Sequence, residues 1–177
     1  GGTTVAATMF AVEKVGIKVF ATGGIGGVHR QSTFDISADL PQLSRCPVVV
    51  VCAGAKSILD LEATLEFLET WGVPVIGYQT DSFPAFFASN SGLAVDTRAE
   101  SAEEVAEIAR AHWGVGLKSG LLVANPAPAE SALDYDDIEE TIQKALLEAQ
   151  AEGIRGNKIT PYLLSKISQL SDGDSMK

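Results

Sequence analysis

Short apolar runs rich in β-branched residues alternate along the chain with longer stretches of helical periodicity. This alternation is typical of an α/β protein, a layered fold in which a mainly parallel central sheet is flanked by helices. The run Val48–Cys52 is apolar throughout, which indicates a strand inside the sheet with both faces covered. The predicted strands are Ile17–Ala21, Val48–Cys52, Val73–Gly77 and Leu121–Ala124.

Capping residues and glycines mark the expected ends of the helices. Ser57–Asp60 and Ser101–Glu104 have the spacing of N-terminal capping boxes, and Thr160-Pro161 fits a cap followed by the first helical residue. Gly16 and Gly72 suit helix ends, where positive φ is common. The predicted helices are Thr4–Val15, Ser57 to about Gly72, Ser101 to about Trp113, Tyr135–Glu152 and Pro161–Leu170.

Size and charge restrict the classes of function. A chain of 177 residues can bury one sizeable core, so we expect a single α/β domain over residues 1–177. The formal net charge of −10 disfavours a general nucleic-acid binder, because phosphate backbones select a basic surface. Cys46 and Cys52 have no disulfide-like spacing, no membrane-length apolar run is present and no secretory signal is visible, so we expect a cytoplasmic protein without a membrane partner. The start at Gly1 rather than Met leads us to expect a fragment of a longer polypeptide.

Three unusual segments follow the carboxyl ends of predicted strands: residues 22–39, 53–57 and 125–128. Ligands of open α/β sheets bind beyond these strand ends, so the three segments are expected to form one site. In the second segment, Ala53-Gly54-Ala55 precedes Lys56, which stands at a predicted helix start. Burial and the positive helix end both disfavour an ammonium ion, so this setting is expected to lower the pKa of Lys56 toward that of a nucleophile. A solvated lysine is the alternative.

Thr22 to His29 contains four glycines within five positions. Such a loop can bring backbone N–H groups close to ligand oxygens, although a flexible turn would have the same composition. Its spacing matches neither a dinucleotide fingerprint nor a Walker loop, so a nucleotide cofactor is poorly supported. His29 alone does not distinguish a catalytic from a structural histidine.

Two carboxylates four residues apart, Asp35 and Asp39, flank Ser37. They can share a hard divalent ion and a polyhydroxy ligand, and one aspartate can suffice for Mg²⁺ or Mn²⁺, which retain several waters. Capping of a helix by the Asp-Leu-Pro segment would equally explain Asp39. The aromatic cluster Phe83–Phe87 can line a pocket for a base or belong to the core.

Taken together, these segments resemble pseudouridine-5′-phosphate glycosidase, the family that also contains indigoidine-synthesis protein A. The resemblance extends over nearly the whole chain. Its carriers are residues 1–9, 19–30, 34–40, 51–60, 77–80, 83–87, 123–126 and 160–164. In that family the region matched here is the central and C-terminal part of the polypeptide, and a catalytic glutamate and a phosphate-binding lysine precede it.

The resemblance implies a reversible reaction in which pseudouridine 5′-phosphate and water give uracil and ribose 5-phosphate. Lys56 matches the family lysine that forms an imine with C1′ of the opened sugar, and Asp35 matches the aspartate that holds one Mn²⁺ ion per subunit. The other implied contacts to the substrate are Val5, Thr22, His29, Ser37, Ala38 and Asp39. A homotrimer and association with the remaining N-terminal segment are also implied. The alternatives are a related C-glycosyl synthase that joins ribose 5-phosphate to another acceptor, a non-catalytic sugar-phosphate-binding fragment and a general Schiff-base aldolase.

Overall fold

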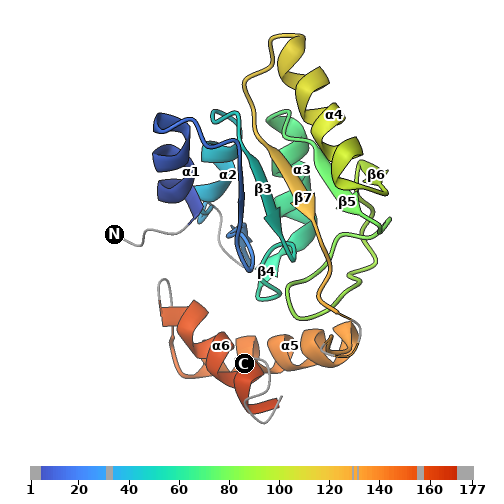
Figure 1. Ribbon diagram of the computed structural model, residues 1–177. Helices are drawn as coiled ribbons and strands as arrows, with labels where there is room; N and C mark the ends of the chain where they lie inside the picture. The colour runs from blue at the N-terminus through green and yellow to red at the C-terminus, as the bar shows by residue number, and fades with distance from the viewer. Residues whose placement is uncertain (1–4, 31–33, 129, 131, 155–157, 171–177) are drawn as a thin grey trace.

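The structure is a computed structural model that describes residues 5–30, 34–128, 130, 132–154 and 158–170. Five parallel strands form its main sheet in the order β1-β3-β7-β5-β6 (Figure 1). The strands are β1 (Val19–Ala21), β3 (Val49–Cys52), β5 (Val75–Tyr78), β6 (Thr97–Ala99) and β7 (Leu121–Ala124). The predicted α/β fold with a mainly parallel sheet is therefore confirmed.

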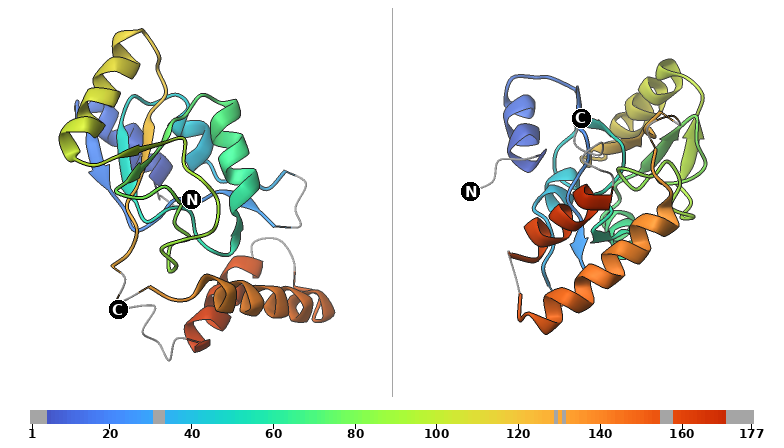
Figure 2. Two further views of the ribbon diagram at one scale, coloured as in Figure 1. Left: turned by 90° about the vertical axis from the view of Figure 1, so that its right-hand side faces the viewer. Right: turned by 90° about the horizontal axis from the view of Figure 1, so that it is seen from below.

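The described residues also form six helices and a small second sheet, which lie around the main sheet. The helices are α1 (Val5–Lys14), α2 (Asp39–Leu43), α3 (Leu61–Thr70), α4 (Ala102–Gly114), α5 (Tyr135–Ala151) and α6 (Ile159–Leu170). The strands β2 (Val28–His29) and β4 (Leu59–Asp60) pair antiparallel. The helices α5 and α6 pack against each other and lie across the end of the main sheet to which β3 and β7 point (Figures 1 and 2).

The two faces of the main sheet belong to different apolar clusters. Alternate side chains of β3 point to opposite faces, so Val50 and Cys52 join the large cluster with α1, α2, α3 and α5, whereas Val49 joins a smaller cluster beside α4. This arrangement explains why the sequence of β3 is apolar throughout. Val19 on the edge strand β1 is 57% exposed, so the smaller cluster does not extend to that edge.

Most predicted elements are found within a few residues of their expected bounds, and Leu121–Ala124 is found unchanged. The helix expected to begin at Ser57 begins instead at Leu61. Its cap is Asp60, whose carboxylate accepts a hydrogen bond from the Ala63 amide at 3.0 Å, whereas the Ser57 hydroxyl donates to the carbonyl of Ala85. The last helix begins at Ile159, two residues before Pro161.

The sequence patterns did not reveal β2, β4 or β6, which are only two or three residues long. Among the described residues, none of the helices combines the length and apolarity required to cross a membrane.

Candidate active site

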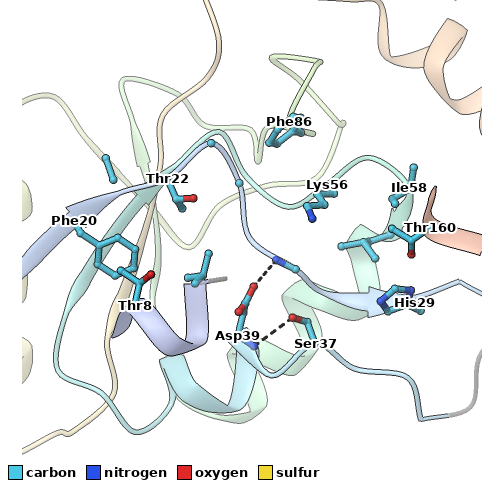
Figure 3. Close-up of a pocket in the computed structure, with 16 residues that line it drawn as sticks. Thr8, Phe20, Thr22, His29, Ser37, Asp39, Lys56, Ile58, Phe86 and Thr160 are labelled. Carbon is cyan, nitrogen blue, oxygen red and sulfur yellow. Dashed lines mark hydrogen bonds between the residues drawn. The ribbon is translucent and has the colours of Figure 1, made fainter. Parts of the chain in front are cut away.

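A cavity of about 600 Å³ lies beyond the carboxyl ends of β1 and β3 (Figure 3). The loops that follow these strands form most of its wall, and α1, α2, α6 and the loop after β5 contribute the rest. Its size is that of a pocket for a small molecule. The lining residues are Val5, Thr8, Phe20, Ala21, Thr22, Gly23, Gly24, Gly26, His29, Ser37, Asp39, Lys56, Ile58, Leu59, Phe86 and Thr160.

The cavity brings together six of the residues that the sequence singled out. These residues are Val5, Thr22, His29, Ser37, Asp39 and Lys56. They come from four separate parts of the chain, so their convergence on one surface is a property of the fold and not of sequence proximity. The third expected segment is not part of the cavity, because Asn125 lines an apolar groove of about 550 Å³ beside α4 instead.

The two loops that form the cavity are joined by backbone hydrogen bonds. The Ala53 amide donates to Gly23 O at 3.0 Å, the Ile25 amide to Gly54 O at 3.0 Å, and the Lys56 amide to Ile25 O at 3.2 Å. Ile25 and Ala55 thereby form a parallel bridge that continues the pairing of β1 with β3. The glycine-rich loop and the turn before Lys56 are therefore one connected unit.

Close packing around this unit explains why glycine occupies positions 24 and 26. A flexible turn was the alternative explanation. A Cβ atom on Gly26 would lie 2.2 Å from Oγ of Ser37, and one on Gly24 would lie 2.4 Å from the ring of Phe86. Both distances are far below a van der Waals contact, so a side chain at either position would displace a wall of the cavity. Gly54 has a φ of +86°, which also favours glycine.

Lys56 is half-buried and lines the cavity (Figure 3). The helix that was expected to follow it directly begins five residues later, at Leu61. The expectation that Lys56 stands at a helix start is therefore wrong. Between Lys56 and α3, the residues Leu59 and Asp60 form β4. This strand pairs with β2, which places His29 opposite Leu59.

Asp39 is a buried carboxylate that joins α1 and α2 to the glycine-rich loop. Its Oδ1 accepts a hydrogen bond from the Ala6 amide at 2.8 Å, and its Oδ2 accepts one from the Gly26 amide at 2.9 Å. Its own amide donates to Oγ of Ser37 at 3.3 Å. Capping of its own helix does not explain Asp39, because the N-cap is Ala38 and no side-chain hydrogen bond caps α2.

Two of the expected site residues lie outside the cavity. Asp35 is exposed and pairs through its backbone carbonyl with the amide of His29, and Ala38 is exposed at the start of α2. Among the described residues, no group of three or more His, Cys, Asp or Glu side chains is arranged to hold a metal ion. Mn²⁺ at Asp35 stays a prediction, since one aspartate together with several waters suffices to hold such an ion.

Arg30 fastens the segment after Lys56 to α5. Its guanidinium donates to the carbonyl oxygens of Ser57 and Leu59 at 3.1 and 3.0 Å, and it forms a bidentate ion pair with Glu139. The hydrogen bond from Arg30 is the main reason that the pKa of Glu139 is lowered from its usual value. Sequence reasoning did not find this link, because the two residues are 109 positions apart.

The lining also includes Thr8, Phe86 and Thr160, which the sequence did not single out individually. Phe86 belongs to the aromatic cluster for which a core and a pocket role were both open. The structure divides that cluster, because Phe83 is fully buried and Phe87 packs against the large apolar cluster, whereas Phe86 lines the cavity.

The fold and the cavity define a class of protein: an α/β protein with a lysine in a cavity at the carboxyl ends of its strands. Residues 1–177 match the family described as "Indigoidine synthase A like protein", and the chain belongs to that family.

Relatives and solved structures agree with this membership. The pseudouridine-5′-phosphate glycosidase of Caldanaerobacter subterraneus is 57% identical over 177 residues, which are 99% of this chain and 58% of the relative. That of Escherichia coli is 54% identical over 179 aligned positions, which cover 100% of this chain and 57% of the relative. The chain thus spans less than two thirds of the length of these relatives.

Two solved structures have the same fold. The prealnumycin C-glycosynthase in complex with ribulose 5-phosphate superimposes with a TM-score of 0.92 at 43% identity, over 97% of this chain and 57% of that one. An indigoidine synthase A-like protein from Thermotoga maritima gives a TM-score of 0.87 at 41% identity, over 98% of this chain and 57% of that one.

Proposed function

We propose that the protein to which this chain belongs is a pseudouridine-5′-phosphate glycosidase, which converts pseudouridine 5′-phosphate and water into uracil and ribose 5-phosphate. The observation that carries the proposal is the position of Lys56 in a cavity of the right size for a small molecule, in a chain at least 50% identical to several relatives of that name. A lysine suits this substrate because a C-glycosidic bond has no leaving-group oxygen for an acid to protonate.

The proposed role of Lys56 is that of a covalent nucleophile. Its Nζ bonds to C1′ of the ribose while the bond from C1′ to the ring oxygen breaks. The ring oxygen takes up a proton and the nitrogen gives one up, which restores the nitrogen lone pair. The nitrogen lone pair then forms a C=N bond as the bond from C1′ to the uracil carbon breaks and that carbon is protonated. Water hydrolyses the resulting imine, which releases ribose 5-phosphate and restores the amine.

The polar wall of the cavity supports a sugar-phosphate ligand. Thr22 and His29 each offer a side chain that can donate a hydrogen bond to a phosphate or sugar oxygen, and both line the cavity with Lys56. Asp39 and Ser37 hold the glycine-rich loop through Gly26, so we propose that they position this wall. The Mn²⁺ ion, the homotrimer and the additional segment stay predictions, and no step above requires the metal.

One observation favours a second candidate, a C-glycosyl synthase that uses the same lysine. The solved structure of the prealnumycin C-glycosynthase, at 43% identity, contains ribulose 5-phosphate. The two functions share the sugar phosphate and differ in the group joined to it. Incubation of the intact protein with ribose 5-phosphate and either uracil or a polycyclic acceptor distinguishes them by which product forms.

Borohydride reduction in the presence of ribose 5-phosphate tests the proposal, because it converts an imine into a stable secondary amine. Peptide mapping should place the adduct on Lys56, and Lys56→Arg should abolish it while the protein stays folded. Lys118→Arg is the matched control, since Lys118 is an exposed lysine outside the cavity, and it should keep the full yield. An adduct on Lys14, Lys18 or Lys118 in place of Lys56 would contradict the assignment.

A further inference from the structure

Phe86 is held in an uncommon backbone conformation at the wall of the cavity. Its φ is +60°, in the left-handed region that bulky side chains seldom adopt and that costs stability. Among the described residues other than glycine, Gln79 is the one other with positive φ. A bulky residue held there by its surroundings indicates a use for the side chain that glycine would not serve.

The surroundings of Phe86 fix the ring between the two loops of the site. Its amide donates to the carbonyl of Ala53 at 2.9 Å, three residues before Lys56. Its ring occupies the place of a side chain on Gly24, 2.4 Å from the ideal Cβ position, and lies 3.4 Å from that of Gly23, an ordinary van der Waals distance. The ring also contacts Phe87 edge to face, with 4.6 Å between the ring centroids. Phe86 is thus a fixed aromatic wall, and Figure 3 shows it in the same cavity as Lys56.

The chemistry of the substrate determines which part of it such a wall can contact. The base is bonded to C1′, the atom that the lysine attacks in the proposed function, so the base must lie beside Lys56. The phosphate lies at the far end of the ribose and requires hydrogen-bond donors, which a phenylalanine lacks. An aromatic wall suits the face of a planar heterocycle, because stacking contributes to binding without any hydrogen bond.

We propose that Phe86 is the surface on which the planar base of the substrate stacks, and that it determines the affinity for the base and not that for the sugar phosphate. This inference rests on the proposed function. It assigns to Phe86 a preference for flat, unsaturated rings as the group joined to C1′. It also explains why Gly24 lacks a side chain, since the ring of Phe86 fills the space that such a side chain would take.

The test compares variants of the intact protein in the synthetic direction, with ribose 5-phosphate and uracil as substrates. Phe86→Leu removes the aromatic ring but keeps an apolar side chain, and it should raise the KM for uracil roughly five- to a hundredfold, the range expected for loss of base stacking. The yield of the borohydride adduct with ribose 5-phosphate should change less than twofold. Phe86→Tyr keeps the ring and should retain the KM for uracil.

Two further variants keep the test decisive if Phe86→Leu does not fold. Phe86→Gly suits a φ of +60° and removes the ring entirely, so it should fold and show the same rise in the KM for uracil. Phe67→Leu changes a partly buried phenylalanine of α3 that stacks on Trp71 outside the cavity, and it should leave the KM for uracil unchanged.

The possible failures of the two proposals are distinguishable. An unchanged KM for uracil in Phe86→Leu and Phe86→Gly would overturn the stacking role, as would an equal loss of adduct formation with ribose 5-phosphate. Absence of a Lys56 adduct in the unaltered protein would instead overturn the proposed function.

Discussion

Replacement of Arg30 by methionine tests whether the connection between the Lys56 turn and α5 stabilises the fold. The side chains of Arg30 and Glu139 are only 15% and 29% exposed, and the guanidinium also serves the carbonyls of Ser57 and Leu59. Methionine keeps the apolar stem but leaves a half-buried carboxylate and two carbonyl oxygens without their donor. Loss of a charged partner costs several kcal/mol in a mostly buried pair and under about 1 kcal/mol in an exposed pair. The Arg30–Glu139 pair lies between these cases, so we expect Arg30→Met to lower the free energy of unfolding by about 2–4 kcal/mol.

Arg98→Met is the matched control. Arg98 is likewise an ion-paired arginine, bonded to the carboxylates of Asp81 and Glu100, but its side chain is 39% exposed. Its loss should cost under about 1 kcal/mol. Urea titration followed by circular dichroism measures both changes. Equal costs for the two variants would refute the reasoning from burial.

The pH dependence gives a second measure of the same pair. The pKa of Glu139 is lowered in the folded state, mainly by the hydrogen bond from Arg30, so the carboxylate contributes stability above its usual value of 4.5. This contribution is lost as the pH falls below 4.5 through the lowered pKa. The difference between the unaltered protein and Arg30→Met should therefore shrink in acid, and a constant difference from pH 7 to pH 3 would contradict the assignment.

The remaining predictions concern the loop unit and the thiols. Gly54→Ala should destabilise the protein by more than about 3 kcal/mol in urea titration, because its Cβ would lie 1.8 Å from the carbonyl oxygen of Pro84 and its φ is +86°. Asp39→Asn should cost about 1–3 kcal/mol, since an amide has one acceptor oxygen for two backbone donors, and hydrogen exchange at those donors should accelerate. Burial raises the pKa of the Cys46 and Cys52 thiols to about 11 and about 12, with Glu13 contributing at Cys46. Folded thiols thus retain protons that unfolded thiols lose above pH 9. The free energy of unfolding should therefore fall by up to about 1.4 kcal/mol per pH unit per thiol as the pH rises beyond 9. Cys52→Ala should reduce that slope in urea titrations at pH 8 to 10.5.

The parts of the fold that could be predicted are those determined by local periodicity. The run from Val48 to Cys52 is apolar at every position because both faces of β3 are covered, and that pattern is visible in the sequence. Ser101 caps α4 as its capping box predicts, accepting a hydrogen bond from the Glu104 amide. The box at Ser57 failed because a tertiary contact decided otherwise: its hydroxyl bonds to the carbonyl of Ala85, 28 residues later.

In the candidate site, too, some residues could be found from local sequence patterns and others depend on tertiary contacts. Lys56, Thr22 and His29 could be found because strand ends and glycine-rich loops mark ligand sites in α/β folds, a rule of topology that sequence patterns carry. Phe86 and Thr160 could not be selected, because nothing local separates a phenylalanine of the wall from its buried neighbour Phe83. Such distinctions depend on long-range packing.

The glycine-rich loop stabilises the site by packing closely and not by remaining free. Gly26 donates to the carboxylate of Asp39, which also accepts from the amide of Ala6, so one buried charge fixes the loop and α1 together. The same loop bonds to the turn before Lys56 through Ile25. Two hydrogen bonds therefore connect Asp39 to the lysine: one from the Gly26 amide to the Asp39 carboxylate and one from the Lys56 amide to the carbonyl of Ile25. A change at Asp39 should therefore alter the orientation of Lys56, because the carboxylate of Asp39 holds the loop to which the Lys56 amide is bonded.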